Sequence, residues 1–397
     1  MNPLARHYSR FRVAERVLLT GHSHQAWPDA GFEAQQRAWL DAAELLDDKW
    51  PAAEARAADV RRGFARLLGD DASNVALGQN THELVTQWLS ALPLADRPHL
   101  VTTDGEFHSL RRQVNRLEET GLLRVEQVPA RPVDTLAARL AGAVGDDTAC
   151  VMASSVLYQT AEIVPGLDRV AQACARAGAE LLVDAYHHLN VVPFDLRALG
   201  LADAFVTGGG YKYCQLGEGN AFLRVPPNRR LRPVLTGWFA EFAQLEARAT
   251  GQVQYGEGAS AFAGATYDPT SHYRGAAVFA FHVQQDLTAE RLREISRRQM
   301  ARLIARIEAL DLDARLLRIE PMPAEGRAGF LALRTPRAPE IARALRERAV
   351  MTDARGDILR LGPAPYLDEG QLDAGVEALA AVLQAISREA SRSSGAD

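Results

Sequence analysis

Short apolar runs alternate with amphipathic stretches between Asp71 and about Leu235. The runs are rich in branched side chains and are bounded by glycine or polar residues, which is typical of buried strands. The stretches between them place apolar residues three or four positions apart, which predicts helices. The predicted strands are NVALG, HLVTT, ACVMAS, AELLVDA and AFVTG, and the predicted helices are His82–Leu92, Ser109–Thr120, Val133–Ala143 and Leu167–Ala177.

This alternation predicts an α/β fold in which a mostly parallel sheet carries helices on both faces. Ligands of such sheets bind beyond the carboxyl ends of the strands. The residues directly after each apolar run are therefore the first candidates for a functional site.

The flanking regions follow other patterns. Residues 1–30 form an irregular arm with a short strand at Val17–Thr20, and residues 31–68 form two amphipathic helices broken at Pro51. One long amphipathic helix is predicted from Ala276 to Ile307, leading out of the large domain. After it come the strands RAGFLALRT and ILRLGP and the helices Ala338–Arg348 and Glu369–Arg388.

These patterns predict three regions along the chain. Residues 1–40 are expected to form an N-terminal arm or part of a small domain. Residues 41–280 are expected to form the large, ligand-binding domain, and residues 281–397 a smaller α+β domain.

Composition narrows the class of protein. The formal net charge of the 397 residues is −5 and no basic block occurs, so neither a nucleic acid nor a membrane surface is expected as a partner. The three cysteines are widely spaced without a C-x-x-C pair, which indicates neither a disulfide framework nor a metal site. No apolar run reaches the ~20 residues of a membrane span and the N-terminus has no apolar leader, so a cytoplasmic protein is expected.

The stretch VTGGGYKYCQLGEG, from Val206 to Gly219, places one lysine between two groups of glycines. Glycines let the backbone approach something bulky that Lys212 also touches. Among apolar and aromatic neighbours an ammonium loses solvation and its pKa falls, which leaves a nucleophilic amine. Pyridoxal phosphate (PLP) is the commonest aldehyde for such an amine to hold. The alternative is a solvated loop lysine beside a glycine-rich turn.

Polar or aromatic residues follow the other strands as well. After NVALG, Gln79–His82 begins a helix, where free N–H groups and the Thr81 hydroxyl suit a phosphate, or where Asn80 simply caps the helix. After HLVTT, the ring of Phe107 could stack on a flat heterocycle or belong to an ordinary turn.

Two further charged residues follow the same logic. Asp184 comes after ELLV and could keep a pyridine nitrogen protonated, and His187 could bond to that aspartate or to a phosphate. A histidine-rich metal site is disfavoured because no further ligand lies at the right spacing. Arg360 in ILRLGP needs an anionic partner, either a substrate carboxylate or a structural ion pair with Asp353 or Asp357.

Taken together, these residues resemble PLP enzymes of fold type I, in the class V aminotransferase superfamily, and within it most closely the kynureninases. The resemblance rests on Tyr-Lys-Tyr with Gly-x-Gly at 211–219, on Asp-x-x-His at 184–187 and on Gly-Trp-aromatic at 237–239. It rests further on Asp-x-Arg at 353–355 followed by Arg-x-x-Pro at 360–363. It spans the chain from about Leu18 to Tyr366.

The resemblance implies a role for each matching residue at the cofactor. Lys212 would hold PLP as a Schiff base and shuttle protons. Tyr211, with Thr81 and Asn80, would bind the phosphate, and Phe107 would stack on the ring. Asp184 would pair with the pyridine nitrogen, and His187 would support that end of the site.

The resemblance also implies how the substrate is bound. Arg360 would bind the substrate carboxylate, and Trp238 would reach the pocket of a neighbouring subunit in a homodimer with shared sites. Ser23 lies in a turn similar to the Gly-x-Ser of the family. Asp268 stands where the family has an asparagine before a proline that helps to hold an aryl ketone, so the polarity around the side-chain pocket is expected to differ from that of the family.

The implied activity is a PLP-dependent hydrolysis of the Cβ–Cγ bond of kynurenine or a similar γ-keto amino acid, which gives alanine and an aryl acid, as in tryptophan catabolism. An aminotransferase or a Cβ-elimination lyase acting on another small amino acid is the alternative. A cysteine desulfurase is disfavoured because residues 350–366 contain no cysteine. A non-catalytic binding module is disfavoured because Lys212, Asp184 and Arg360 are all present.

Overall fold

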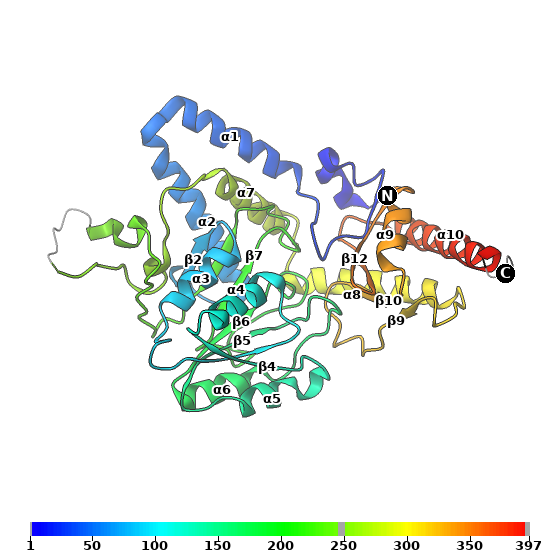
Figure 1. The fold of residues 1–397 in the computed structure, drawn as a ribbon. Coiled ribbons are helices and arrows are strands. Elements are labelled where there is room, and N and C mark those ends of the chain that lie inside the picture. The colour runs from blue at the N-terminus through cyan, green and yellow to red at the C-terminus, as the bar shows by residue number, and fades with distance from the viewer. Residues whose placement is uncertain (1, 245–250, 394–397) are drawn as a thin grey trace.

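A seven-stranded sheet forms the largest part of the computed structural model, which describes residues 2–244 and 251–393. Its strand order is β2-β8-β7-β6-β5-β3-β4 (Figure 1). All of its strands except β8 run in one direction, which confirms the expected mostly parallel sheet. The strands are β2 (Val75–Gly78), β3 (His99–Thr103), β4 (Arg124–Val128), β5 (Thr148–Ser154), β6 (Glu180–Asp184), β7 (Phe205–Gly209) and β8 (Ala221–Arg224).

Helices cover both faces of this sheet because successive strand residues point to opposite sides. Val151 and Val206 belong to one buried cluster, whereas their neighbours Met152 and Phe205 belong to another. The first cluster is closed by α2 (Trp50–Leu68), α5 (Leu136–Gly142), α6 (Leu167–Ala177) and α7 (Thr270–Gln284), and the second by α3 (Thr81–Ser90) and α4 (His108–Glu119).

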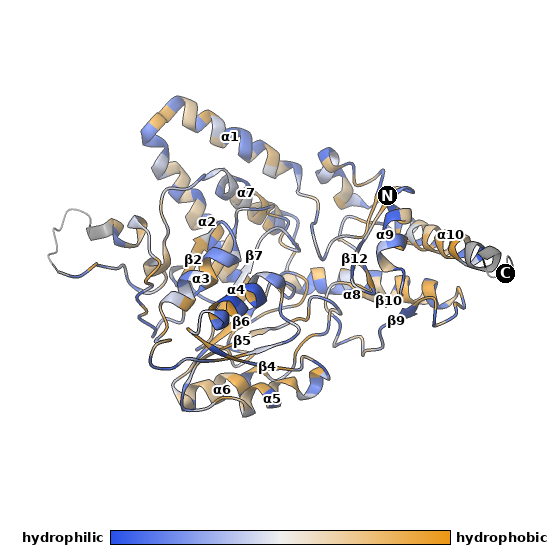
Figure 2. Cartoon of the chain, viewed as in Figure 1, coloured by the Kyte–Doolittle hydropathy of each residue, from blue (hydrophilic) through white to orange (hydrophobic). Residues whose placement is uncertain are grey.

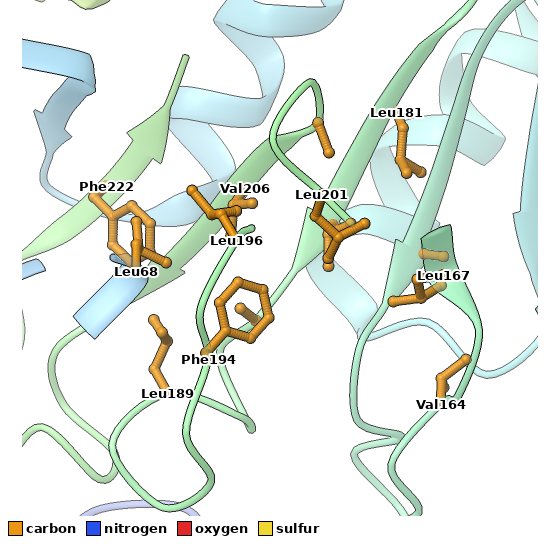
Figure 3. Close-up of a cluster of buried hydrophobic side chains, with 14 of the residues drawn as sticks. Leu68, Val164, Leu167, Leu181, Leu189, Phe194, Leu196, Leu201, Val206 and Phe222 are labelled. Carbon is orange, nitrogen blue, oxygen red and sulfur yellow. The ribbon is translucent and has the colours of Figure 1, made fainter. Parts of the chain in front are cut away.

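The long connection between β6 and β7 adds to the first cluster. Phe194, Leu196 and Leu201 from this connection are buried beside Val206 of β7 and Leu68 of α2 (Figure 3). The connection thereby fills the space between the sheet and α2, and it fixes the ends of β6 and β7 relative to each other.

A second, antiparallel sheet follows in the chain, with the order β12-β13-β10-β9. Tyr8 and Leu19 from the N-terminal arm are buried in the same cluster as Leu359 and Leu361 of this sheet. Figure 1 shows the N-terminus near the C-terminal helices. The domain limits at residues 40 and 280 stay a prediction. The elements are β9 (Arg318–Ile319), β10 (Leu331–Arg334), β12 (Asp353–Arg355) and β13 (Ile358–Leu361), with α8 (Ala289–Glu308), α9 (Ala338–Arg346) and α10 (Glu369–Ser393).

The N-terminal region contains the expected elements. The short strand β1 (Val17–Leu18) pairs in parallel with β11 (Val350–Met351). A helix break precedes Pro51, so that α1 (Asp29–Leu45) and α2 are separate helices, with the proline in the first turn of α2. Within residues 2–244 and 251–393, no helix is both long and apolar enough to cross a bilayer.

The prediction of one helix from Ala276 to Ile307 is wrong. The chain forms two helices there, α7 and α8, separated by a tight turn. Asp286 adopts a left-handed conformation with φ 53°, and the Thr288 side chain accepts a hydrogen bond from Arg291 N–H at the start of α8. Such a side-chain cap starts a new helix, because it satisfies a donor that has no partner within the helix.

The strand before Lys212 also differs from its prediction. It begins at Phe205, one residue into the predicted run AFVTG, and it continues through Gly208 to Gly209, one residue beyond that run. The two glycines pair with Phe222 and Ala221 of β8, an antiparallel strand that the sequence pattern did not predict. The glycines are therefore part of the sheet itself.

We predict that the contact between α2 and α7 tolerates no side chain at Gly63. A Cβ at Gly63 would overlap the ring of Phe279, so Gly63→Ala is expected to lower the free energy of unfolding by ~1–3 kcal/mol. Gly142→Ala is the matched control, because its added Cβ would meet no atom within 4 Å. That control should be neutral or stabilising by up to ~1 kcal/mol. Urea unfolding measures both, and equal midpoints would contradict the tight contact.

Candidate active site

A cavity of about 260 Å³ opens at the carboxyl ends of the parallel strands. Sheets of this type bind their ligands at that edge. The residues that line the cavity come from the segments after β2, β3, β5, β6 and β7, and they include Thr81, Phe107, Tyr158, Asp184, His187 and Lys212.

The amine of Lys212 is buried in this cavity. The residue is 5% exposed, and its Nζ lies 2.9 Å from Nε2 of His187. Nζ also lies 4.2 Å from the ring centre of Tyr186 and 5.4 Å from that of Phe107. Burial lowers the pKa of Lys212 to about 7, although the charge of Asp184 acts to raise it. At neutral pH a large fraction of this amine is therefore uncharged and nucleophilic.

Lysine is rare in this chain. The sequence contains 45 lysines and arginines together, of which only Lys49 and Lys212 are lysines. An arginine keeps its proton at any physiological pH, whereas a desolvated lysine can release it. Lys212 therefore supplies the cavity with a chemistry that the common basic residue of this chain cannot provide.

The glycines of β7 make room for Tyr186. A Cβ at Gly209 would overlap the Tyr186 hydroxyl, and the same ring lies beneath the Lys212 amine. Gly217, with φ 68°, lies against the indole of Trp27 from the N-terminal arm. The bulky group that the glycine pattern predicted near Lys212 thus includes the aromatic side chains of the protein itself.

Asp184 is the last residue of β6, and it lines the cavity. Its Oδ1 accepts a hydrogen bond of 2.8 Å from Tyr186 N–H. Its Oδ2 has no hydrogen-bond partner among the described residues. Burial raises the pKa of Asp184, and the positive charge of Lys212 counteracts this shift. The free oxygen is thus suited to a cationic N–H donor.

His187 is a neutral partner of the lysine. Burial, followed by the charge of Lys212, lowers the pKa of His187 well below its ordinary value. Its Nε2 bonds to Lys212 rather than to Asp184, and in the described part of the chain its buried Nδ1 has no partner.

The start of α3 was expected to be either a helix cap made by Asn80 or a phosphate site that includes Thr81, and the structure is compatible with both. The Asn80 side chain caps the helix, because it accepts a bond of 2.9 Å from Glu83 N–H and donates one of 2.8 Å to the Glu83 carboxylate. Both Asn80 and Thr81 nevertheless line the cavity, as does Tyr211. The first N–H groups of α3 therefore face the same space as the Lys212 amine.

Arg360 is buried and fully engaged. Its Nε donates to Asp353 Oδ1 at 2.8 Å, its Nη2 bonds to Asp353 Oδ2, and its Nη1 donates to the Tyr158 carbonyl at 2.6 Å. Asp353 also pairs with His22 Nε2 at 2.8 Å. The structural ion pair considered as an alternative is thus present, and Arg360 is not among the residues lining the cavity. Its role in binding a substrate stays a prediction.

Ser23, Trp238 and Asp268 do not line the cavity within the described part of this chain. The Ser23 hydroxyl lies 3.1 Å from His24 Nδ1. The Trp238 side chain is 45% exposed. Asp268 accepts a hydrogen bond of 2.9 Å from Thr270 N–H at the start of α7. Their predicted contacts with a substrate therefore remain untested.

Sequence reasoning missed several residues around the cavity. Ser154 is the last residue of β5 and Tyr158 follows that strand, so the rule applied to the other strand ends could have found them. Asn220 lines the cavity just before β8, and no sequence signal marked that strand. The described residues contain no cluster of three or more His, Cys, Asp or Glu that could hold a metal ion.

Glu106, directly before Phe107, is a further buried residue that no sequence pattern singled out. Its carboxylate is buried and accepts bonds from Ser154 N–H at 3.1 Å, the Ser154 hydroxyl at 2.6 Å and the Thr103 hydroxyl at 2.7 Å. Burial raises the pKa of Glu106 to about 7 in spite of these bonds. It ties the turn that carries Phe107 to the end of β5.

The buried amine of Lys212 is predicted to react at an unusually low pH for a lysine. Labelling with formaldehyde and cyanoborohydride between pH 5 and 9 should reach half-reaction near pH 7 for Lys212, because burial lowers its pKa to about 7. A lysine with the ordinary pKa of about 10.4 would not reach half-reaction in this range. In Asp184→Asn the Lys212 profile should move to lower pH, because the carboxylate that raises its pKa is lost. Peptide mass spectrometry measures the Lys212 site, and a reactivity that still rises steeply up to pH 9 would contradict the assignment.

Comparisons with known proteins agree with this architecture. Residues 292–379 match the family model of the kynureninase C-terminal domain. The chain is 29% identical to isopenicillin N epimerase of Streptomyces clavuligerus over 234 residues, which is 57% of this chain and 58% of that protein. It is 24% identical to the uncharacterized aminotransferase YcbU of Bacillus subtilis (strain 168) over 345 residues, 84% of this chain and 85% of that protein.

Solved structures extend the similarity to the whole fold. A C-DES mutant with glycine covalently linked to the PLP cofactor superposes with a TM-score of 0.83 at 18% identity, covering 95% of this chain and 99% of that one. The apo cysteine desulfurase of Thermococcus onnurineus NA1 gives a TM-score of 0.80 at 14% identity, covering 97% and 99%. The expected fold type I architecture is therefore confirmed.

Proposed function

We propose that this chain is a PLP-dependent enzyme that acts on an amino acid. The observation that carries the proposal is the buried Lys212 amine, with its pKa lowered to about 7, in a cavity at the carboxyl edge of a fold type I sheet. The similarity of the fold to a C-DES structure that contains PLP supports the choice of cofactor.

The residues present fit PLP at its aldehyde, its ring nitrogen and its phosphate. The amine of Lys212 suits the aldehyde, and the free Oδ2 of Asp184 suits the protonated ring nitrogen. The ring of Phe107 faces the same cavity as a flat surface for stacking. The start of α3 at Thr81, together with Tyr211, offers donors for the phosphate.

When bound, PLP supplies an aldehyde and a protonated ring that accepts electrons from a carbanion. Asp184 would keep the ring nitrogen protonated through its carboxylate. Lys212 would remove the proton from the substrate Cα, because an amine with a pKa near 7 is an efficient base at neutral pH. The neutral His187 would orient that amine through its bond of 2.9 Å.

We further propose that the reaction cleaves a bond at the Cβ of the substrate, as in the hydrolysis of a γ-keto amino acid such as kynurenine to alanine and an aryl acid. The match of residues 292–379 to the kynureninase C-terminal domain supports this reaction. So does the order of the residues from Asp184 to Arg360 along the chain.

A Cβ-elimination or transamination of another small amino acid is the second candidate. It is favoured by the position of Asp268, which bonds to Thr270 and does not reach the cavity of its own chain. The residue matched to the family's ketone-binding asparagine thus supplies no contact to an aryl ketone within this chain.

A homodimer is part of the proposal. The outer end of α1 carries hydrophobic residues (Figure 2). Trp39 of α1 is 77% exposed, and Leu46, directly after α1, is 70% exposed. Trp238, also exposed, would reach the cavity of a second copy. Covering these side chains would remove apolar surface from water.

The amine of Lys212 is predicted to carry the cofactor. After incubation with PLP and reduction with borohydride, the wild-type chain and Lys49→Ala should show a pyridoxyl mass on the peptide that contains Lys212. Lys212→Ala should show none, and its turnover should fall by at least ~10²–10⁴-fold because the general base is lost. Retention of full turnover by Lys212→Ala would sink the mechanism.

Cys214 is predicted to have no part in the chemistry. Its thiol is 1% exposed, and burial raises its pKa to about 12, so it is protonated and shielded at neutral pH. Cys214→Ser should therefore keep kcat/KM within about two-fold of the wild-type value, since nucleophilic cysteines act as thiolates. A complete loss of activity with normal cofactor loading would favour persulfide chemistry instead.

A further inference from the structure

A second buried carboxylate lies directly behind the residues that line the cavity. Glu106 is 2% exposed and precedes Phe107 in the turn between β3 and α4. Its Oε1 accepts hydrogen bonds from the Thr103 hydroxyl at 2.7 Å and from Ser154 N–H at 3.1 Å. Its Oε2 accepts one from the Ser154 hydroxyl at 2.6 Å. Three donors thus point at one carboxylate, an arrangement that favours its ionised form.

Ser154 connects Glu106 with Asp184. It is the last residue of β5, it lines the cavity, and in the parallel register it stands opposite Asp184 of β6. Neighbouring strands lie ~4.8 Å apart, so only one residue of β5 separates the two carboxylates. Burial raises the pKa of Glu106 to about 7 and the charge of Asp184 adds to this effect, whereas the bonds from Ser154 and Thr103 act to lower it.

The cavity offers little positive charge to these two carboxylates. Neither Glu106 nor Asp184 forms an ion pair within the part of the chain that the structure describes. Burial lowers the pKa of Lys212 to about 7, and it keeps His187 neutral. Buried carboxylates are costly unless a cation or hydrogen-bond donors compensate them. A cationic ligand at Asp184 would supply the charge that the protein lacks there.

The other groups near Glu106 do not supply that charge. The groups that face it from β3 and β5 are two hydroxyls and one N–H. On its own turn, the Asp104 carboxylate accepts a bond of 2.7 Å from Ala130 N–H. The guanidinium of Arg111 on α4 is exposed and lies 3.0 Å from the His108 ring. These side chains are therefore engaged away from Glu106.

We propose that Glu106 is a positioning residue that stabilises a cationic ring nitrogen at Asp184, through its bonds to Ser154 and through its negative charge. This inference rests on the proposed function, because it adds a second group that tunes the cofactor end of the same site. A cation at Asp184 favours the ionised form of Glu106. By reciprocity, the ionised form of Glu106 then favours binding of the cation.

The test compares PLP with its carbocyclic analogue, in which a C–H group replaces the ring nitrogen. Equilibrium dialysis of the cofactor-free chain at pH 8 gives both dissociation constants without relying on turnover. Glu106→Gln keeps the size of the side chain but removes its charge, so PLP should bind about 10-fold more weakly. Binding of the analogue should change by less than about two-fold, since it carries no charge at that position.

The preference for PLP over the analogue, measured as the ratio of their dissociation constants, should also depend on pH. Glu106 is ionised above its pKa of about 7 and neutral below it, so wild type and Glu106→Gln should differ less at pH 6 than at pH 8. Ser154→Ala removes a bond that lowers the pKa of Glu106, so its preference should develop at a higher pH than that of wild type. Glu106→Asp keeps the charge and should retain the preference.

Glu180→Gln is the matched control. Glu180 is the first residue of β6 and Asp184 the last, so this variant loses a carboxylate at the far end of the same strand. Its preference for PLP should equal that of wild type. If Glu106→Gln weakens both ligands equally, or lowers the preference no more than Glu180→Gln does, the inference is overturned. In the first case Glu106 supports the fold of the turn and not the cation.

The mass of the Lys212 peptide after borohydride reduction separates this inference from the proposed function. A wild-type chain that neither binds PLP nor carries the pyridoxyl mass would end both. A normal mass in wild type, together with the same preference for PLP in wild type and in Glu106→Gln, would overturn only the role of Glu106.

Discussion

The desolvation of one amine is the constraint on which the site depends. Burial removes the charged form of Lys212 from water, and this desolvation lowers the pKa by more than the charge of Asp184 raises it. A neutral amine therefore exists at neutral pH. This balance holds only while water is kept away from Nζ. Tyr186, Phe107 and His187 enclose the amine, and the glycines of β7 allow Tyr186 to lie so close.

The N-terminal arm and the lysine loop hold each other in place. Tyr8 donates to Oε1 of Gln215 at 2.7 Å, and Gln215 donates to Oε1 of Gln25 at 2.7 Å. Gln215 itself has a positive φ of 61°, an unusual conformation for a residue with a side chain. Buried amide networks of this kind are favourable only when every member is paired, so the loop that carries Lys212 is fixed by residues far away in sequence.

The fold and the chemistry are supported in different ways. The superpositions at 14–19% identity define the architecture, which many activities share. The choice of substrate depends on the side chains around the cavity. The resemblance alone did not reveal that Asp268 and Arg360 are bonded to groups of the protein itself. Asp268 bonds to Thr270, and Arg360 is already neutralised by Asp353.

The sequence by itself determined the alternation of strands and helices and the position of the site. Apolar periodicity depends on neighbours along the chain, so the strands before Thr81, Phe107 and Lys212 and the strand that ends at Asp184 could be located. The carboxyl ends of parallel strands lie at one edge of the sheet, which predicted that these residues lie together. The unpredicted strand β8, the break before α8 and the bonds of Glu106 depend on partners or caps that no periodicity encodes.

Only the tertiary structure decided the charge state of the site. The sequence left open whether Arg360 pairs with Asp353 or binds a substrate. The contacts that decide this join Arg360 to Tyr158, 202 positions away, and Asp353 to His22, 331 positions away. The pKa of Lys212 has the same origin. Desolvation is set by everything that surrounds an atom in space, and a linear pattern records only the neighbours along the chain.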